Sequence, residues 1–291
     1  MKSINNISIF IMFVLVLACT ICGCSSGSKQ MSIEFRSLDA FEIGGFDDTD
    51  GGVHTSDYPL WSSENRSYHQ DVSAKQSVSV EFNGVTYSGE YLYSAVWLPN
   101  TYLSHKYDGD KMYFEVNADT GALCSIMFAY EPSENATISE ADCKKIADAI
   151  ADDYVSLSDY KVDVTRSEIY DNFICTYKYY REVSGYKTSD YLTVSIDGNG
   201  GVTSFRTYML GSFENVGKVS LNKNEEKVAI ENKLATIYAN STTRKGYTVD
   251  NVVLVKLDDD SFGFLYTISN EFVYGDVRLG SQLYLLLKNK N

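Results

Sequence analysis

Residues 173–183 read Phe-Ile-Cys-Thr-Tyr-Lys-Tyr-Tyr-Arg-Glu-Val, a stretch rich in aromatic and β-branched residues that contains neither Gly nor Pro. This composition favours a β-strand, because such side chains pack well on a pleated surface. Successive side chains of a strand point to opposite faces of the sheet. Tyr177 and Tyr179 are therefore predicted to share one face, and Lys178 and Tyr180 to share the other.

Strand-like segments occur on both sides of this stretch. They are rich in Tyr, Val and Ile, and the whole chain contains only 3 Pro residues. Clusters of Asp, Asn and Gly at 197–201 and of Asp and Ser at 258–261 mark turns between them. The further segments expected to form strands are 77–98, 160–166, 191–196, 202–209, 248–257, 262–269 and 272–287.

Two segments carry helical signals instead. Residues 139–142 (Ser-Glu-Ala-Asp) have the form of a capping box, and residues 222–225 (Asn-Lys-Asn-Glu) resemble the same device. Apolar side chains follow each segment at the spacing of three and four residues that places them on one helix face. These side chains are Cys143, Ile146, Ala147, Ile150 and Tyr154 after the first segment, and Ile230, Leu234, Ile237 and Tyr238 after the second.

Each predicted helix precedes a run of predicted strands, and its single apolar stripe needs a flat surface to cover. We therefore predict an α+β fold, with repeated units of a helix packed on a twisted antiparallel sheet and a β-rich N-terminal region. The expected boundaries are 31–134 for the β-rich region, 135–215 for the first unit and 216–291 for the second.

Residues 138–141 (Ile-Ser-Glu-Ala), Ala147 and the Asp-x-x-Gly-Gly-Val pattern at 197–202 resemble the PepSY domain. The resemblance is best over residues 137–209 and weaker over residues 221–288. PepSY domains are small α+β units found in protease propeptides and in many bacterial lipoproteins. The resemblance implies a non-catalytic binding or inhibitory module, and it assigns no catalytic residue.

The N-terminus has the features of a secretory signal. Lys2 precedes an apolar run over 7–18, which is shorter than a membrane-spanning helix requires. Residues 21–24 (Ile-Cys-Gly-Cys) resemble the bacterial lipobox, so residues 1–23 are predicted to be a signal peptide and Cys24 the lipidated residue. Residues 24–30 are predicted to be a tether that holds the protein at the extracytoplasmic face of the cell membrane through its lipid.

Charge restricts the class of partner. The chain has 39 Asp and Glu residues against 25 Lys and Arg residues, which gives a net charge of −14. A surface this acidic repels nucleic acid, so no nucleic-acid role is expected, whereas a basic peptide would be attracted. The same charge also serves solubility.

The residue types that most often carry out catalysis are sparse. The three histidines, His54, His69 and His105, are scattered along the chain. Ser158 and Lys161 match the Ser-x-x-Lys element of penicillin-binding enzymes, but the other elements of that site are not separately present. No catalytic or cofactor-binding residue is predicted.

Two further groups of residues contain the side chains that commonly bind metals. Cys124, Cys143 and Cys175 show no zinc-site spacing and lie among apolar residues, so they are expected to be small core residues. Counted from Phe46, the acidic loop at 47–52 and the later Asp57 partly fit a calcium loop, but the first position lacks its Asp and the last lacks its Glu. A solvated turn is the preferred interpretation, and no metal site is predicted.

The leading functional prediction is a non-enzymatic, lipid-anchored envelope protein that binds a protein or peptide. An exposed row of tyrosines on the 173–183 strand would stack on such a partner. Two alternatives stay open: an envelope hydrolase with an unrecognised site, and a lipoprotein that binds a small ligand or a polysaccharide.

Anchoring is predicted to depend on the sulfur of Cys24, because that atom carries the lipid in the lipobox interpretation. Cys24→Ser should release the protein from membranes or leave it unprocessed, as measured by detergent-phase partitioning. Cys19→Ser, at the poorer second match over 16–19, is the control and should stay in the detergent phase. The opposite pattern would assign the anchor to Cys19.

Overall fold

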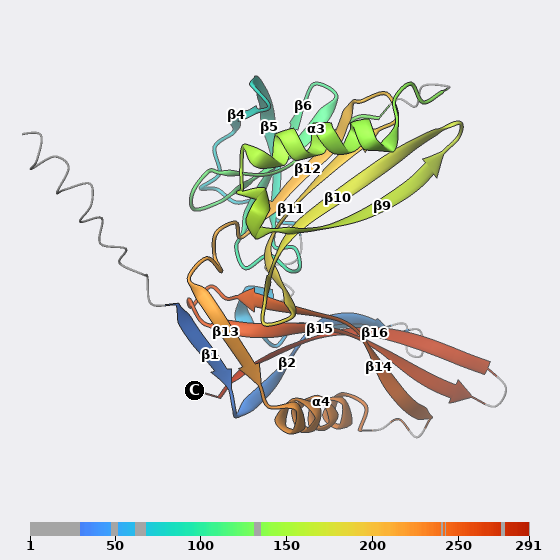
Figure 1. Ribbon diagram of the computed structural model, residues 1–291. Helices are drawn as coiled ribbons and strands as arrows, with labels where there is room; N and C mark the ends of the chain where they lie inside the picture. The colour runs from blue at the N-terminus through green and yellow to red at the C-terminus, as the bar shows by residue number, and fades with distance from the viewer. Residues whose placement is uncertain are drawn as a thin grey trace, which may run out of the picture.

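The computed structural model describes residues 30–47, 52–61, 68–130, 135–239, 241, 243–274 and 277–290. The described chain forms two halves joined by a long hairpin (Figure 1). The first half, named the α3 half, contains β4 (Ser77–Phe82), β5 (Val85–Ala95), β6 (Ser104–Gly109), β7 (Met112–Asn117), β8 (Leu123–Phe128), α3 (Glu140–Asp152), β9 (Lys161–Ile169), β10 (Asn172–Val183), β11 (Tyr186–Asp197) and β12 (Val202–Tyr208). The second, named the α4 half, contains β1 (Met31–Phe35), β2 (Leu38–Asp47), β3 (Gly52–Thr55), β13 (Val216–Leu221), α4 (Lys223–Ile237), β14 (Arg244–Lys256), β15 (Phe262–Tyr274) and β16 (Val277–Asn289).

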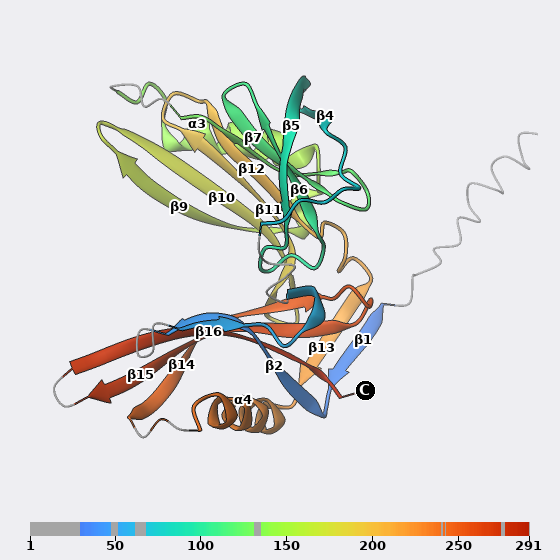
Figure 2. The ribbon, with the colours of Figure 1, turned by 180° about the vertical axis from the view of Figure 1, so that it is seen from behind.

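Strand pairing within each sheet is antiparallel. In the α3 half the order is β9–β10–β11–β12–β8–β7–β6–β5–β4, and in the α4 half it is β14–β15–β16–β2–β3. Strands β1 and β13 form a separate parallel pair beside the α4 half. Seen from behind, β4 to β7 lie on the side of the α3 half that is away from α3 (Figure 2).

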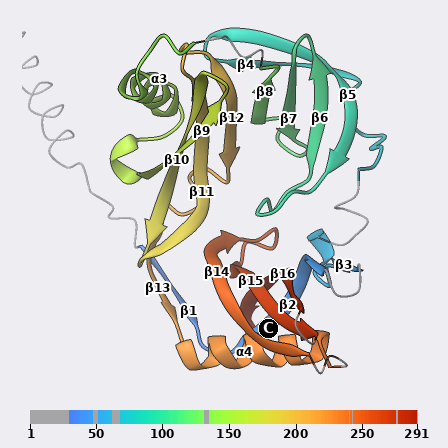
Figure 3. The ribbon, with the colours of Figure 1, turned by 90° about the vertical axis from the view of Figure 1, so that its right-hand side faces the viewer.

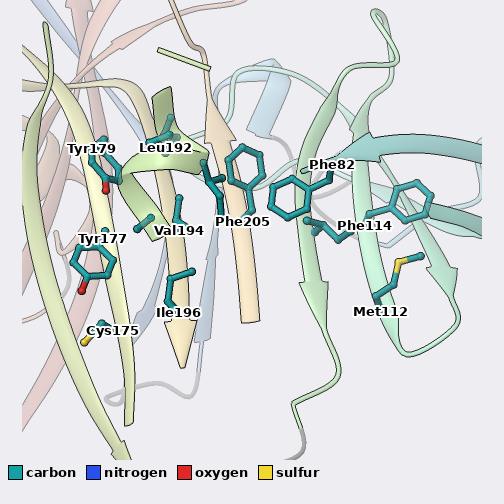
Figure 4. Packing of buried hydrophobic residues seen from close by; sticks show 14 of the residues in the cluster. Phe82, Met112, Phe114, Cys175, Tyr177, Tyr179, Leu192, Val194, Ile196 and Phe205 are labelled. Atoms are coloured by element: carbon teal, nitrogen blue, oxygen red, sulfur yellow. The ribbon is translucent and has the colours of Figure 1, made fainter. Parts of the chain in front are cut away.

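Helix α3 begins where the sequence places it. Ser139 is its N-cap, and the Ser139 hydroxyl accepts a hydrogen bond from the backbone N–H of Asp142. Cys143, Ala147 and Ile150 are buried on one face, which packs on β10 and β11. The core continues across the sheet, where Phe205 lies between the side chains of β11 and Phe82, with 4.9 Å between the two phenyl centroids (Figure 4).

Helix α4 is built in the same way. The Asn222 side chain accepts hydrogen bonds from the backbone N–H groups of Asn224 and Glu225. Ile230 and Leu234 are buried against β2 and β16. The burial of this stripe supplies most of the helix stability, since isolated helices of this length are marginal in water.

The β10–β11 hairpin connects the two halves. Most of its length lies in the α3 half, but Val183 and Tyr186 at its tip are packed in the core of the α4 half. The ring centroids of Tyr186 and Phe264 are 4.8 Å apart. Thr188 then pairs in parallel with Leu254 of β14, which joins the two sheets into one 14-stranded sheet, with β10 and β9 branching from β11. In Figure 3 the strands of the α3 half stand above β14, β15 and β16.

A buried ion pair lies near the tip of this hairpin, where it passes from the α3 half to the α4 half. Arg181 Nε lies 3.2 Å from Oδ2 of Asp190, whose side chain is fully buried. Tyr160 donates a 2.5 Å hydrogen bond to the same carboxylate. Burial raises the pKa of Asp190, and hydrogen bonds and the charge of Arg181 oppose that shift. Two of these hydrogen bonds come from backbone N–H groups in the 209–215 segment, which connects β12 to β13, so the carboxylate links the hairpin to that segment.

The predicted fold class is wrong. The protein is mostly β, with 56% of residues in strands and 15% in helices, and the two α-helices of the described residues lie on a large multi-stranded sheet. Repeated helix-on-sheet units do not form because the strands after each helix pair with strands from the N-terminal region: β12 with β8, and β16 with β2. Such pairings cover sheet edges that a separate unit would leave open. Strands of the predicted region 31–134 thus contribute to both halves, and the predicted domain boundaries remain a prediction.

Removing the positive partner of the buried pair should destabilise the protein strongly. Arg181→Gln leaves Asp190 buried without its cation, and we expect a loss of about 3–5 kcal/mol in the free energy of unfolding. Without Arg181 the pKa of Asp190 rises further, so the stability of the variant should fall as pH rises through that pKa and recover in acid. Urea unfolding over a range of pH measures both effects.

Arg166→Gln is the matched control for this substitution. Arg166 makes two partly exposed ion pairs, with Glu140 and Glu168, and lies 4.7 Å from the centre of the Phe173 ring, so its loss should cost about 1 kcal/mol. Equal losses for the two arginines would show that the buried pair does not hold the hairpin.

Candidate functional site

Two tyrosines of β10 face α3. Tyr177 and Tyr179 point under α3: the Tyr177 hydroxyl donates to the carbonyl of Glu140 at 2.9 Å, and the Tyr179 hydroxyl donates to Asp148 at 2.7 Å. Lys178 therefore lies on the opposite face of the sheet, as strand alternation requires. The expected outward row of tyrosines on this strand is not Tyr177 and Tyr179.

A polar row crosses that opposite face. Directly paired residues of neighbouring strands share a face of the sheet, so the strand register defines which side chains lie side by side. The row contains Lys106 of β6, Glu115 of β7, Ser125 of β8, Arg206 of β12, Thr193 of β11, Lys178 of β10 and Asp163 of β9. At its centre Thr193 is flanked by two cations, Lys178 and Arg206.

A row of hydroxyl groups lies on one side of Lys178, Thr193 and Arg206. It is formed by Thr176, Ser195 and Ser204, which are paired across β10, β11 and β12. The Thr176 and Ser195 hydroxyls are 2.8 Å apart, and the Ser204 hydroxyl lies 2.9 Å from that of Ser195. Because hydroxyl hydrogens rotate, this network can turn donors toward a bound group.

A row of three tyrosines lies on the other side. Tyr180, Tyr191 and Tyr208 are buried together, and the rings of Tyr191 and Tyr208 are 4.2 Å apart. The Lys178 ammonium lies 3.9 Å from the centre of the Tyr191 ring. Arg206 donates a 3.0 Å hydrogen bond to the Tyr208 hydroxyl. Tyr191 and Tyr208 thus contact the two cations, one through its ring and the other through its hydroxyl.

Two adjoining cavities lie over this face and are together named the inter-sheet cleft. One, of about 280 Å³, is lined by Ser125, Ile126, Met127, Thr176, Lys178, Tyr191, Thr193, Ser195, Ser204, Phe205, Arg206 and Tyr208. The other, of about 390 Å³, is lined by Val96, Trp97, Leu98, Pro99, Lys178, Tyr191, Asn251, Val253, Leu265, Thr267 and Tyr284, and so lies between the two halves. Lys178 and Tyr191 line both cavities and mark where they meet.

The two cations of the cleft have no acid partner in direct contact. Among the residues that the structure describes, no carboxylate oxygen lies within 4.0 Å of the Lys178 ammonium or the Arg206 guanidinium. Burial lowers the pKa of Lys178, and the charge of Lys187 lowers it further, whereas Asp163 raises it. Asp163 itself bonds the ammonium of Lys187.

The cysteines occupy the positions that were expected of them. Cys124, Cys143 and Cys175 are free and buried, which confirms the prediction of core residues. Burial raises the pKa of the Cys124 and Cys143 thiols to about 11, so both remain protonated and unreactive near neutral pH.

Neither His69 nor His105 lines the cleft. His105 is buried, and its Nδ1 lies 2.7 Å from the Ser94 hydroxyl, while His69 forms a backbone bridge with the same serine. Burial lowers the pKa of His105. Lys161 forms an ion pair with Glu182 rather than contacting Ser158, whose hydroxyl lies near that of Ser156.

Two sequence predictions concern residues that the structure does not describe. Cys24 lies outside the described residues, and so do Asp48, Asp50 and Gly51 of the acidic loop. Asp57, the last position of the proposed calcium loop, forms a 2.6 Å ion pair with Lys233. Within the described ranges, no group of three or more His, Cys, Asp or Glu side chains is arranged to hold a metal ion.

Comparisons with known proteins identify no relative of this chain. No family model, curated protein or solved structure matches this chain. The resemblance to the PepSY domain remains a prediction. Neither helix of the described chain combines the length and apolar composition that a membrane span needs.

Sequence reasoning identified Lys178 on an alternating strand but missed Arg206, Thr193 and the hydroxyl row. Each of these residues is ordinary in its own segment, and its role depends on pairing with strands distant in the chain. The two-residue periodicity of 202–209 placed Ser204 and Arg206 on one face, which was the only local signal.

Lys178 should contribute little to stability, because its partly buried ammonium lacks a carboxylate partner. Lys178→Met keeps an apolar stem over Tyr191, and we expect the free energy of unfolding to change by no more than about 0.5 kcal/mol. Tyr191→Ala removes a buried ring and should cost about 3–5 kcal/mol in the same urea titration. A loss above about 2 kcal/mol for Lys178→Met would assign Lys178 a structural role.

Proposed function

We propose that this protein is a lipid-anchored, extracytoplasmic binding protein that holds a small ligand in the inter-sheet cleft. The observation that carries the proposal is the convergence of two cations, a hydroxyl row and aromatic rings on two adjoining cavities. Cavities of this size, with mostly apolar walls and a few placed polar groups, are typical of small-molecule sites.

The two halves supply different parts of the site. The α3 half provides the polar floor, which includes Lys178, Thr193 and Arg206. The α4 half provides apolar wall from Val253 and Leu265. A site between two sheets is favourable for a small molecule, since both sheets exclude water from its surface.

A small ligand is favoured over a protein or peptide partner, which was the leading prediction from sequence. That prediction relied on an exposed row of tyrosines. Tyr180, Tyr191 and Tyr208 are instead buried against one another, with at most 7% of each residue exposed, so they cannot offer a ladder to an extended chain. The anchoring part of the proposal rests on the sequence of residues 7–24.

The position of Trp97 makes the proposal measurable. The chain has only two tryptophans, Trp61 and Trp97. Trp61 is fully buried and donates a 2.8 Å hydrogen bond to the carbonyl of Asn100, so it gives a constant background. Trp97 lines the cleft, and a ligand that enters should change its fluorescence.

The experiment titrates the dialysable fraction of spent bacterial culture medium into the protein while tryptophan fluorescence is recorded. We expect a saturable change that is absent in Trp97→Phe. Thr267→Phe, which fills the larger cavity, should also abolish the change without altering the melting temperature. A signal that persists in Trp97→Phe, or no saturable signal in the native protein, would contradict binding in the cleft.

A further inference from the structure

The charge of the cleft differs from that of the rest of the protein. The chain carries 39 acidic against 25 basic residues, yet Lys178 and Arg206 face the same cavity with no carboxylate in contact. Thr193 lies between them in the strand register, so their Cα atoms are two strand spacings, or about 10 Å, apart. A carboxylate or phosphate group over Thr193 would lie within reach of both long side chains.

The nearest acidic side chains are Asp163, which is bonded to other residues, and Glu115, which does not lie between the two cations. Asp163 is engaged by Lys187 and by the Tyr180 hydroxyl, which donates to it at 3.4 Å. Glu115 is separated from Arg206 by Ser125 of β8. Between the two cations the row therefore offers only the Thr193 hydroxyl, which can donate to an anion.

The hydroxyl row strengthens the case for an anionic group. Thr176, Ser195 and Ser204 form one connected network at the far side of the smaller cavity. Hydrogen bonds from hydroxyls and cations to an oxyanion are shorter and stronger than bonds between neutral groups. A cationic ligand would instead meet two like charges, which is costly in a partly buried site.

The larger cavity determines the rest of the ligand. It adjoins the anion position at Lys178 and Tyr191, and its other walls include the apolar side chains of Trp97, Val253 and Leu265. Burying an apolar group there removes it from water and adds binding energy in proportion to its area. An inorganic anion would use only the smaller cavity.

We infer that the inter-sheet cleft binds an amphiphilic organic anion, with its carboxylate or phosphate head between Lys178 and Arg206 and its apolar body against Trp97 and Leu265. The inference rests on the proposed function and adds the chemical class of the ligand. The anionic head provides orientation, because both cations line the smaller cavity and the lining of the larger cavity adds no further cation.

The test uses three probes of similar shape: hydrocinnamate, its neutral amide hydrocinnamamide, and phenethyl phosphate. Each is titrated into the native protein with Trp97 fluorescence as the readout. We expect the carboxylate or the phosphate to bind at least about tenfold more tightly than the amide, since each charge-assisted hydrogen bond contributes a factor of this order. The tighter of the two anions identifies the head group.

Two variants locate the effect. Lys178→Gln/Arg206→Gln should bind the anions and the amide with equal affinity, and melting curves confirm that it is folded. Lys145→Gln is the control, because Lys145 is exposed on α3 and pairs with Asp142. It should leave the preference for anions unchanged. If the double variant does not fold, Lys178→Gln alone must reduce the preference at least about threefold.

The outcomes separate the inference from the proposed function. Equal binding of acid and amide by the native protein would overturn the anionic site. Failure of all three probes, while the medium fraction still changes Trp97 fluorescence, would overturn the ligand class and leave the cleft as a binding site. Absence of any saturable signal would contradict both.

Discussion

The β10–β11 hairpin is the element on which the rest of the structure depends. One part of it lies under α3 in the core of the first half, and its tip carries Val183 and Tyr186 into the core of the second. The Arg181–Asp190 pair lies where the hairpin passes from one half to the other, and burial there makes an unpaired carboxylate costly. Because one hairpin is packed in both cores, the interactions that stabilise each core also fix the position of the two halves relative to each other. The cleft between them is a consequence of this arrangement.

The same hairpin places the functional face through strand alternation. Tyr177 and Tyr179 bury their rings beneath α3 and satisfy their hydroxyls on the helix, so Lys178 must emerge on the opposite face. A lysine beneath α3 would lose its hydration in an apolar core, which is far more costly than burying a tyrosine whose hydroxyl is bonded. The alternation of this one strand thus places the core tyrosines on one face and the cation of the cleft on the other.

Local signals predicted local structure well. The capping residues Ser139 and Asn222 stand at the helix starts that the sequence indicated. Most of the predicted apolar residues behind them are buried or half-buried, but Tyr154 lies beyond the end of α3 and is exposed. The expected strands are present at 173–183 and 202–209, within a few residues of their observed ends. Cysteine burial followed from apolar neighbours. These features depend on residues within a few positions of one another.

The fold class and the site could not be obtained in this way. Both depend on which strand edges meet, and the decisive pairings join β12 to β8 and β16 to β2, which are distant in sequence. The prediction of closed helix-on-sheet units failed because a strand pattern does not specify its partner. Arg206 was missed for the same reason: it faces Lys178 only through the registers of β12 with β11 and of β11 with β10.

The central claim is that the hairpin presents two cations to an anionic head while the opposing sheet accepts an apolar body. The most direct test is anomalous diffraction from crystals of the protein with para-bromohydrocinnamate. The account predicts a bromine peak in the larger cavity near Trp97 and Leu265, with the carboxylate between Lys178 and Arg206. A bromine peak at the hydroxyl row, with the carboxylate directed away from both cations, would contradict it, as would a ligand bound only outside the cleft.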